Sequence, residues 1–237
     1  MNRLSGKNAM VIGGSRGIGA AIVERLAADG ARVTFTFARA EARAAETAAR
    51  TGARALKVDS ADRPALVATV REAGPLDILV ANAGIAVFGD PLATDPGAVD
   101  AMFDVNVRAP WHAFVEAART MPDGGRLIAI GSANADRVPT PGGAAYALTK
   151  SALSGMVRGL ARDLGGRGIT VNLVQPGPVD TEANPADGPI ASLLHGFMAI
   201  PRHVRTEEVA AMVAWLASAE AAMVTGTTQT IDGGFTA

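Results

Sequence analysis

Residues 8–30 read NAMVIGGSRGIGAAIVERLAADG, and this stretch decides the fold. Its opening run, residues 8–13, is mainly apolar and predicts a strand. Residues 17–29 place four aliphatic side chains on one face, as in an amphipathic helix, and Gly30 follows as a helix-ending glycine. A glycine-rich turn therefore joins a strand to a helix at the start of a βαβ unit.

The alternation of strand and helix continues along the whole chain. Apolar runs predict further strands at 32–37, 54–58, 76–81, 125–130, 169–174 and 227–231. Amphipathic stretches predict helices at 40–50, 62–73, 95–120, 144–164 and 206–217, the last capped by Thr206. This order predicts an α/β fold: a Rossmann-type, doubly wound parallel sheet of about seven strands with helices on both faces. No linker or repeat interrupts it, so residues 1–237 are predicted to form a single domain.

The composition is that of an ordinary globular protein, with 49% hydrophobic and 19% charged residues. A net charge of −1 gives no general attraction for a nucleic acid polymer or an anionic membrane. No apolar run approaches the roughly 18 residues of a membrane-spanning helix, and no secretory pattern is present, so we expect a cytoplasmic protein. Because the chain has no cysteine, thiol nucleophiles, thiolate ligands and disulfides are excluded.

The three histidines, His112, His195 and His203, do not have the spacing of metal ligands. We therefore expect no metal site. His195 and His203 are close enough in sequence to meet in one loop, but the pattern favours satisfied surface histidines.

The glycine turn is suited to a dinucleotide pyrophosphate. That group needs bare backbone N–H groups and the positive end of a helix, and glycines remove the side chains that would block its approach. Glycine-rich turns also occur for steric reasons alone, but the position after the first strand of a βαβ unit favours a cofactor. The residues expected to contact it are Gly13, Ser15, Arg16, Gly17, Ile18 and Gly19.

The end of the second strand indicates which dinucleotide binds. Sites selective for NAD usually carry an acid there, which holds the ribose hydroxyls and repels a 2′-phosphate. Here Phe37 occupies that position and Arg39 follows it. Arg39 and Arg16 offer guanidinium groups that suit a phosphate, although Arg39 also reads as one of many solvated arginines. NADP(H) is therefore predicted in preference to NAD.

Polar residues also follow the third and fourth strands, at the sheet edge where open α/β folds bind ligands. Asp59 and Ser60 follow the third strand, and Asp59 either accepts from an adenine amine or caps the next helix. Asn82 and Gly84 follow the fourth strand. Asn82 either touches the cofactor or braces neighbouring turns.

The pentapeptide Tyr146-Ala147-Leu148-Thr149-Lys150 pairs the only tyrosine of the chain with a lysine four residues later. On a helix the two side chains share a face. A cation about 4 Å away at an effective dielectric near 20 contributes roughly 4 kcal/mol, or about three pKa units. The lysine is thus expected to bring the pKa of the phenol near neutrality, where it exchanges protons readily. The alternative is a half-buried tyrosine beside a surface lysine.

Two further residues are candidates for the same pocket. Ser132 ends the fifth strand, where its hydroxyl is able to donate to a developing oxyanion. Asn106 lies within the predicted helix 95–120, four residues before Pro110, whose missing N–H should free the Asn106 carbonyl. Taken alone, each is more simply interpreted as a structural residue.

The order of these motifs resembles the short-chain dehydrogenase/reductase family over essentially the whole chain. The matching pieces are the glycine turn, Asn82-Ala83-Gly84, Asn106, Ser132, Tyr146 with Lys150, Pro176-Gly177, Thr225-Gly226 and Asp232-Gly233-Gly234. The resemblance implies that Tyr146 exchanges the proton and that Lys150 lowers its pKa and binds the nicotinamide ribose. It implies that Ser132 orients the substrate carbonyl and that Asn106 completes a proton relay through water. The cofactor contacts that it adds are Pro176, Gly177, Val179 and Thr181.

The chain departs from the family pattern at two places. Ile12 stands where the family usually has threonine, which removes a hydroxyl that ties the glycine turn to the Asn82 region. Ser132 precedes Tyr146 by one residue more than the family pattern has.

Two functions follow from the resemblance. The first is an NADP(H)-dependent carbonyl reductase or alcohol dehydrogenase, in which residues 182–205 form a substrate lid. In that lid Leu193, Leu194, Phe197 and Met198 either line an apolar pocket or form a subunit contact. The second is a regulatory protein that binds cyclic di-GMP, because the glycine turn, Asp136-Arg137 and residues 180–185 resemble a family member with that ligand. The family also implies a homodimer or homotetramer.

Overall fold

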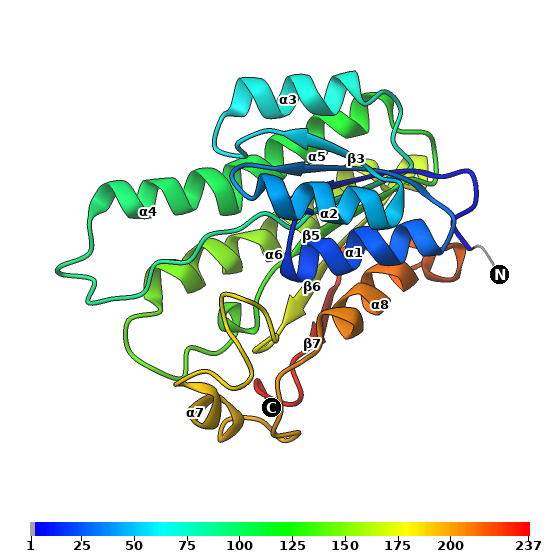
Figure 1. Cartoon of the computed structure of the whole chain (residues 1–237). Helices are drawn as coiled ribbons and strands as arrows, with labels where there is room; N and C mark the ends of the chain where they lie inside the picture. The colour runs from blue at the N-terminus through cyan, green and yellow to red at the C-terminus, as the bar shows by residue number, and fades with distance from the viewer. Residues whose placement is uncertain (1–2) are drawn as a thin grey trace.

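The computed structural model describes residues 3–237, and its core is one seven-stranded, all-parallel sheet (Figure 1). The strands are β1 (Asn8–Ile12), β2 (Arg32–Phe37), β3 (Arg54–Lys57), β4 (Ile78–Ala81), β5 (Arg126–Ile130), β6 (Thr170–Pro176) and β7 (Thr228–Ile231). They lie in the order β3-β2-β1-β4-β5-β6-β7, so the chain winds outward in both directions from β1 and β4. The predicted α/β class, strand number and doubly wound sheet are confirmed.

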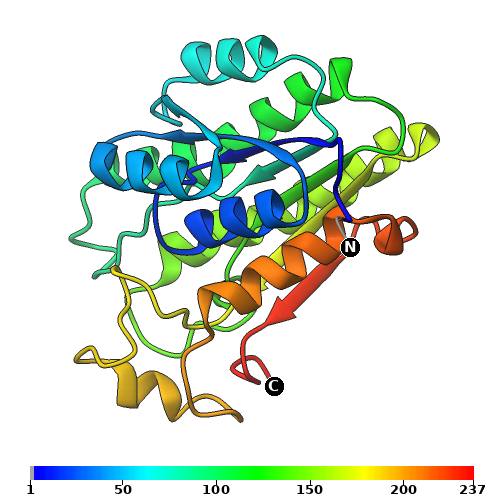
Figure 2. The same cartoon turned by 45° about the vertical axis from the view of Figure 1, so that its right-hand side comes forward.

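Helices cover both faces of the sheet (Figure 2). On one face lie α1 (Gly17–Ala28), α2 (Glu41–Thr51) and α8 (Thr206–Ala217), and on the other α3 (Arg63–Glu72), α5 (Ala109–Thr120) and α6 (Ala144–Leu164). Each face buries its own hydrophobic cluster, and β4, β5 and β6 are buried along their whole length, as in sheets covered on both sides. Single 3₁₀ turns are η2 (Ala133–Ala135), η3 (Gly165–Arg167) and η4 (Ala219–Ala221).

The predicted helix 95–120 changes geometry in its middle. It consists of α4 (Pro96–Phe103), a π-helical turn η1 (Asp104–Arg108) and α5. Pro110 has no N–H to donate to the carbonyl of Asn106, and the N–H of Ala109 reaches back five residues to Asp104. The disturbance expected from Pro110 is therefore present, as a π-turn that contains Asn106.

The segment 182–205 contains a short helix that the sequence did not predict, α7 (Ala191–His195). Beyond it, Phe197 and Met198 pack against Phe235 near the C-terminus. These two side chains cover the C-terminal segment of their own chain, and their part in a substrate pocket or a subunit contact stays a prediction. The bare backbone of Gly233 permits this approach, since a Cβ there would lie 2.9 Å from the Met198 Cε.

Arg137 connects the same segment to the end of β5. Its guanidinium lies 5.7 Å from the ring centroid of Phe197 and 5.6 Å from that of Phe235, and it donates to the carbonyl of Phe235. Cation–π contacts of this kind hold a guanidinium against two aromatic faces. The second half of the 182–205 segment is thus fixed to the body of the protein.

Two histidines meet, contrary to the expectation of separate surface side chains. His195 Nε2 and His203 Nδ1 lie 2.7 Å apart, and His203 is only 3% exposed. Burial lowers the pKa of His203 and the neighbouring His195 lowers it further, whereas Asp180 raises it. The contact forms because a backbone bridge between Val179 and Val204 folds the segment back on itself. Within residues 3–237, no group of three or more His, Asp or Glu side chains is arranged to hold a metal.

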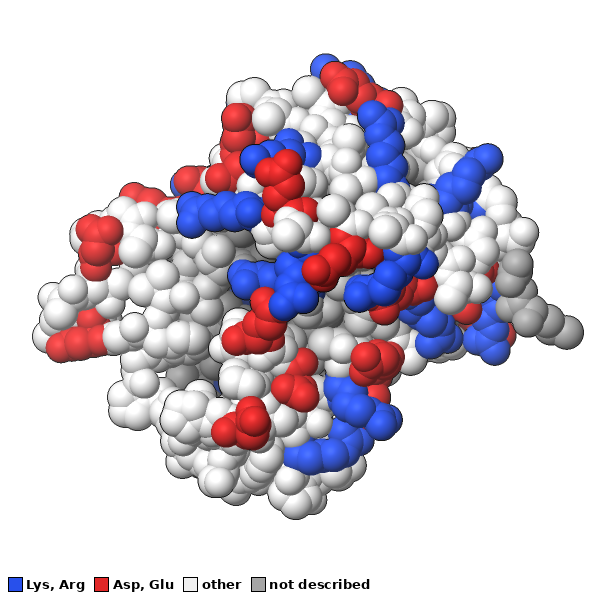
Figure 3. Space-filling model, viewed as in Figure 1, with Lys and Arg blue, Asp and Glu red and all other residues white. Residues whose placement is uncertain are grey.

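Two predicted helix caps are corrected. Asp62, and not Asp59, caps α3, because its carboxylate accepts from the N–H of Ala65 at 3.0 Å. Arg205 is the N-cap residue of α8, and the Glu208 carboxylate accepts from the Arg205 N–H at 2.8 Å. In the part of the chain that the structure describes, no helix has the length and hydropathy needed to cross a membrane. Acidic and basic side chains are interspersed on the face shown in Figure 3.

Candidate active site

The glycine turn lies between the end of β1 and α1. Gly13 has a φ of +81°, and a Cβ there would lie 2.8 Å from the Cα of Ala83, so the neighbouring backbone leaves no room for a side chain. A Cβ at Gly19 would lie 1.9 Å from the carbonyl oxygen of Gly13. Gly19 therefore serves the close packing of α1 on the turn, whereas the residues before it face the cleft described below.

Asn82 braces this turn. Its side-chain amide donates to the Gly13 carbonyl at 2.7 Å. The backbone N–H groups of Asn82 and Ala83 donate to the Ile12 carbonyl at 3.1 and 2.8 Å. The hydroxyl lost through Ile12 is thus compensated by backbone bonds and by Asn82 itself. Of the two interpretations offered for Asn82, the structure supports the bracing one and also places the residue at the cleft wall.

A cleft of about 1000 Å³ opens along the carboxyl edge of the strands, in front of the glycine turn. Eleven of the predicted cofactor residues line it: Gly13, Ser15, Arg16, Gly17, Ile18, Arg39, Asp59, Ser60, Asn82, Gly84 and Thr181. Lining residues that the sequence did not single out include Thr36, Val58, Val105 and Glu182. Thr36 is the most informative of these, since its hydroxyl accepts from the Gly13 N–H at 3.1 Å. The sequence signal that could have identified Thr36 is that it is a polar residue just before the end of the second strand.

Three predicted contacts lie beside this cleft rather than in its wall. Pro176 ends β6, and the N–H of Gly177 donates to the Ile231 carbonyl at 3.0 Å. Val179 is 6% exposed and its segment pairs with that of Val204. These residues position the backbone that leads to Thr181, which does reach the cleft.

The basic residues predicted for a 2′-phosphate are both at the cleft, but their surroundings differ. Arg39 is exposed and lines the wall. Arg16 forms an ion pair of 3.7 Å with Glu182. Asp59 accepts from the Ala61 N–H at 3.0 Å, which leaves its second oxygen for other donors.

Lys150 is buried against the end of the fifth strand. It is 4% exposed, and its ammonium donates to the carbonyl of Ile130 at 3.0 Å. Burial lowers the pKa of Lys150 to about 8. The alternative of a surface lysine is therefore excluded, since this side chain lies inside the protein with its ammonium bonded to a backbone carbonyl.

Tyr146 lies one helical turn before Lys150 on the same face of α6, as the spacing requires. The Lys150 nitrogen is 5.9 Å from the centroid of the Tyr146 ring. Burial raises the pKa of Tyr146 above its ordinary value, and a hydrogen bond with Ser132 lowers it in part. The expectation of a phenol pKa near neutrality is thus wrong for this structure, because desolvation by burial outweighs the lowering by Ser132.

Asn106 connects the catalytic residues to the loop after β4. Its side-chain amide donates to the Ile85 carbonyl at 2.8 Å and to the Thr149 hydroxyl at 3.0 Å, and its oxygen accepts from the Ile85 N–H at 2.9 Å. These three bonds fix the side chain, while Pro110, which has no N–H, leaves the main-chain carbonyl of Asn106 without the usual donor four residues later. Thr149 was not predicted; its place inside the Tyr146–Lys150 pentapeptide was the only signal.

Gly84 is where the cleft and the catalytic residues meet. A Cβ at Gly84, which lines the cleft, would lie 3.3 Å from the Lys150 nitrogen and 3.4 Å from the Asn106 side-chain oxygen. Beyond this point the ring of Phe88 packs on Tyr146, with centroids 5.4 Å apart and 60% of Phe88 exposed. A ligand that lies along the cleft therefore comes close to the Lys150 ammonium at Gly84. The exposed ring of Phe88 forms an apolar wall beside the phenol of Tyr146.

The comparisons with known proteins agree with this geometry. The family model described as enoyl-(acyl carrier protein) reductase matches residues 12–236. The cyclic-di-GMP-binding biofilm dispersal mediator protein of Escherichia coli is 58% identical over 99% of both chains. A crystal structure of BdcA in complex with NADPH has a TM-score of 0.98 and 58% identity, over 99% of this chain and 96% of that one. A short-chain dehydrogenase from Burkholderia cenocepacia in complex with NADP has a TM-score of 0.94 and 48% identity, over 99% and 100%. The chain belongs to the short-chain dehydrogenase/reductase family of oxidoreductases.

Proposed function

We propose that the chain transfers hydride between NADP(H) and the carbonyl or alcohol group of a small-molecule substrate. The residues present fit that cofactor: the turn is bare of side chains where a pyrophosphate needs backbone N–H groups, and Arg16 and Arg39 lie at the cleft wall. The relatives crystallised with NADPH and NADP support the same choice. When bound, the nicotinamide supplies or accepts the hydride.

The chain's own residues manage the proton. In the reducing direction Tyr146 donates its phenolic proton to the substrate oxygen, which the Ser132 hydroxyl orients. A raised pKa keeps this phenol protonated at neutral pH, so it is prepared to act as an acid. Lys150 contributes a buried positive charge that stabilises the phenolate left behind, and Asn106 links Lys150 to solvent through its main-chain carbonyl.

The single observation that carries this proposal is the junction at Gly84. It brings a buried ammonium to the wall of a nucleotide-sized cleft, one helical turn from the only tyrosine of the chain. Burying a cation costs free energy, and the proton transfer proposed at Tyr146 gives this lysine a role beyond its contact with the nicotinamide ribose.

Tyr146→Phe tests the proposal. We expect turnover of NADPH with an accepted carbonyl substrate to fall about 10²- to 10⁴-fold, the usual contribution of a general acid. NADPH affinity, measured by calorimetry on the same variant, should stay near that of the wild type. Unchanged turnover in the variant would contradict the assigned role.

A second function is binding of cyclic di-GMP, favoured by the 58% identity to the Escherichia coli mediator. Arginines at the cleft mouth would hold its phosphates and stack on its guanines. Calorimetry with cyclic di-GMP, with and without NADPH, separates the two functions. Heat of binding that NADPH abolishes supports a shared cleft, whereas no heat in either case removes this function.

The remaining assignments belong to the same proposal. Residues 182–205 act as the substrate lid of a single domain that spans the chain, and Leu193 on α7, 54% exposed, is an apolar side chain of this lid that is open to a substrate. The protein works in the cytoplasm as a homodimer or homotetramer. The exposed side chains Trp111 on α5 and Leu148 on α6 support an interface there.

A further inference from the structure

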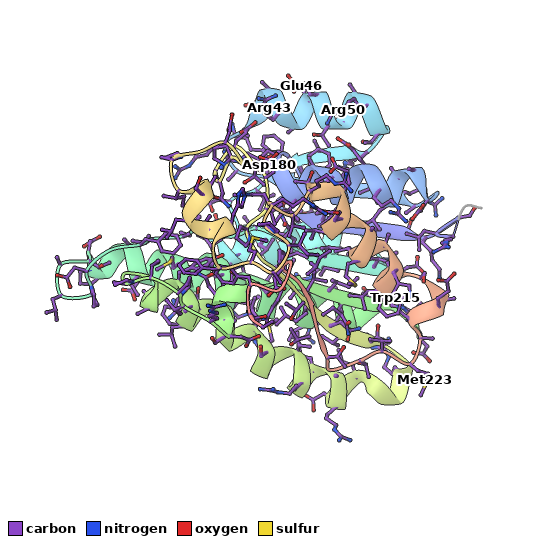
Figure 4. The ribbon with its side chains drawn as sticks, turned by 90° about the horizontal axis from the view of Figure 1, so that it is seen from below. Arg43, Glu46, Arg50, Asp180, Trp215 and Met223 are labelled. Atoms are coloured by element: carbon purple, nitrogen blue, oxygen red, sulfur yellow. The ribbon has the colours of Figure 1, made fainter. Side chains whose placement is uncertain are left out.

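Glu182 occupies the arginines of the cleft mouth. One oxygen of its carboxylate lies 3.0 Å from Arg43 of α2, and the other lies 3.7 Å from Arg16 of the glycine turn. Figure 4 shows Arg43 at the end of α2 nearer to the segment that carries Asp180. The Glu182 carboxylate thus joins its own segment to the glycine turn and to α2. Both Glu182 and Arg16 line the cleft.

The position of Glu182 is set by the backbone hydrogen bonds of a tight turn. The N–H of Thr181 donates to the Asn184 carbonyl at 3.3 Å, and the N–H of Asn184 returns to the Thr181 carbonyl at 3.0 Å. The Asp180 carboxylate accepts from the Ala186 N–H at 3.0 Å just beyond. Backbone bonds on both sides therefore present the Glu182 side chain to the cleft.

Electrostatics make this carboxylate a competitor of an anionic ligand. Arg16 shares its guanidinium between Glu182 and a phosphate that enters, and the carboxylate itself repels that phosphate. All three side chains are about half exposed, with 51% of Glu182, 61% of Arg16 and 56% of Arg43 accessible. The pair is consequently weak enough to exchange for a dianionic phosphate.

We propose that Glu182 is an internal competitor for the 2′-phosphate of the cofactor at Arg16, and that Arg43 holds the competing carboxylate in place. The carboxylate holds Arg16 and Arg43 together until a 2′-phosphate takes Arg16. Glu182 then keeps Arg43, so binding of the phosphate loosens the first residues of the lid from the glycine turn. This inference rests on the proposed NADP(H) site and makes Glu182 a determinant of cofactor affinity and selectivity.

The test is Glu182→Gln, with calorimetry of 2′,5′-ADP and of 5′-AMP at low ionic strength. The two ligands differ only in the 2′-phosphate and need no turnover. We expect the variant to bind 2′,5′-ADP about two- to five-fold more tightly, the worth of an exposed ion pair, and 5′-AMP with little change. High salt should shrink the gain, because exposed charges are screened.

Glu46→Gln is the matched control. Glu46 also pairs with Arg43, at 3.3 Å, but it does not contact Arg16. It should leave the ratio of the two affinities as in the wild type. In Arg16→Met, the further change Glu182→Gln should affect 2′,5′-ADP binding less than it does in the wild type, because only the direct repulsion between carboxylate and phosphate is then removed.

The outcomes are distinct. Equal affinity of 2′,5′-ADP for the wild type and Glu182→Gln overturns the inference, as does weaker binding of both ligands to the variant, which would mean that Glu182 clasps the nucleotide. If the wild type binds neither 2′,5′-ADP nor NADPH, the proposed function fails, and the inference fails with it.

Discussion

Replacing Lys150 by methionine removes a buried cation from the junction between the cleft and Tyr146. Burial lowers the pKa of Lys150 from its ordinary 10.5 to about 8, so between these values the unfolded chain binds more protons than the folded one. The free energy of unfolding of the wild type must then rise with pH across this window. With about 1.4 kcal/mol per pKa unit, linkage gives a gain of about 2 kcal/mol between about pH 7 and about pH 9.5.

Urea unfolding of the wild type and Lys150→Met at several pH values in that range measures this effect. The difference in stability between the two proteins should change by about 2 kcal/mol with pH, whatever constant cost comes from the lost bond to the Ile130 carbonyl. The comparison stops below about pH 10, because the raised pKa of Tyr146 acts in the opposite direction above it. Parallel pH curves for the two proteins would refute the conclusion that Lys150 is a desolvated cation.

The other predictions concern the glycine turn and the histidine pair. Gly19→Ala puts a methyl group 1.9 Å from the Gly13 carbonyl oxygen, so it should destabilise the protein by about 1–3 kcal/mol and abolish NADPH binding. Gly155→Ala, whose Cβ would meet no atom of a neighbouring element within 4 Å, should do neither. Thermal unfolding and calorimetry decide, and similar behaviour of the two variants would count against the turn geometry. Because burial and His195 lower the pKa of His203, its contribution to lid stability is present above about pH 6.5 and is lost as the pH falls below that value. Proteolysis within residues 182–205 should therefore accelerate at about pH 5 in the wild type, and an unchanged rate would contradict the buried pair.

The fold could be predicted from the sequence because each element carries its own local signal. Apolar runs, amphipathic periods and the glycine turn gave all seven strands and the long helices, with ends that differ by one or two residues. Pro110 predicted a disturbance of the helix near Asn106, but it did not predict that the disturbance is a π-turn. These are effects of residues on their immediate neighbours.

The segment 182–205 could not be predicted in the same way, since its partners are remote in sequence. Phe197 packs on Phe235 and Arg137, and His195 meets His203 through a backbone bridge at Val204. No periodicity encodes such contacts. The sequence showed only that the segment is polar and rich in proline and glycine.

In the candidate site, residue identities were predictable and energies were not. The spacing of Tyr146 and Lys150 placed both side chains on one helix face, but the direction of the pKa shift depends on how deeply each is buried. Arg16 was expected to meet a phosphate, yet its partner in the structure is Glu182, which the sequence gave no reason to place there.

The most direct measurement of the central claim follows the hydride itself. The protein is mixed with NADPH deuterated at the transferable C4 position and with a carbonyl substrate, and the product alcohol is analysed by mass spectrometry. The account predicts one deuterium on the former carbonyl carbon, formed with the wild type and lost with Tyr146→Phe. An alcohol that forms without deuterium, or no product with any carbonyl while NADPH is bound, would contradict it.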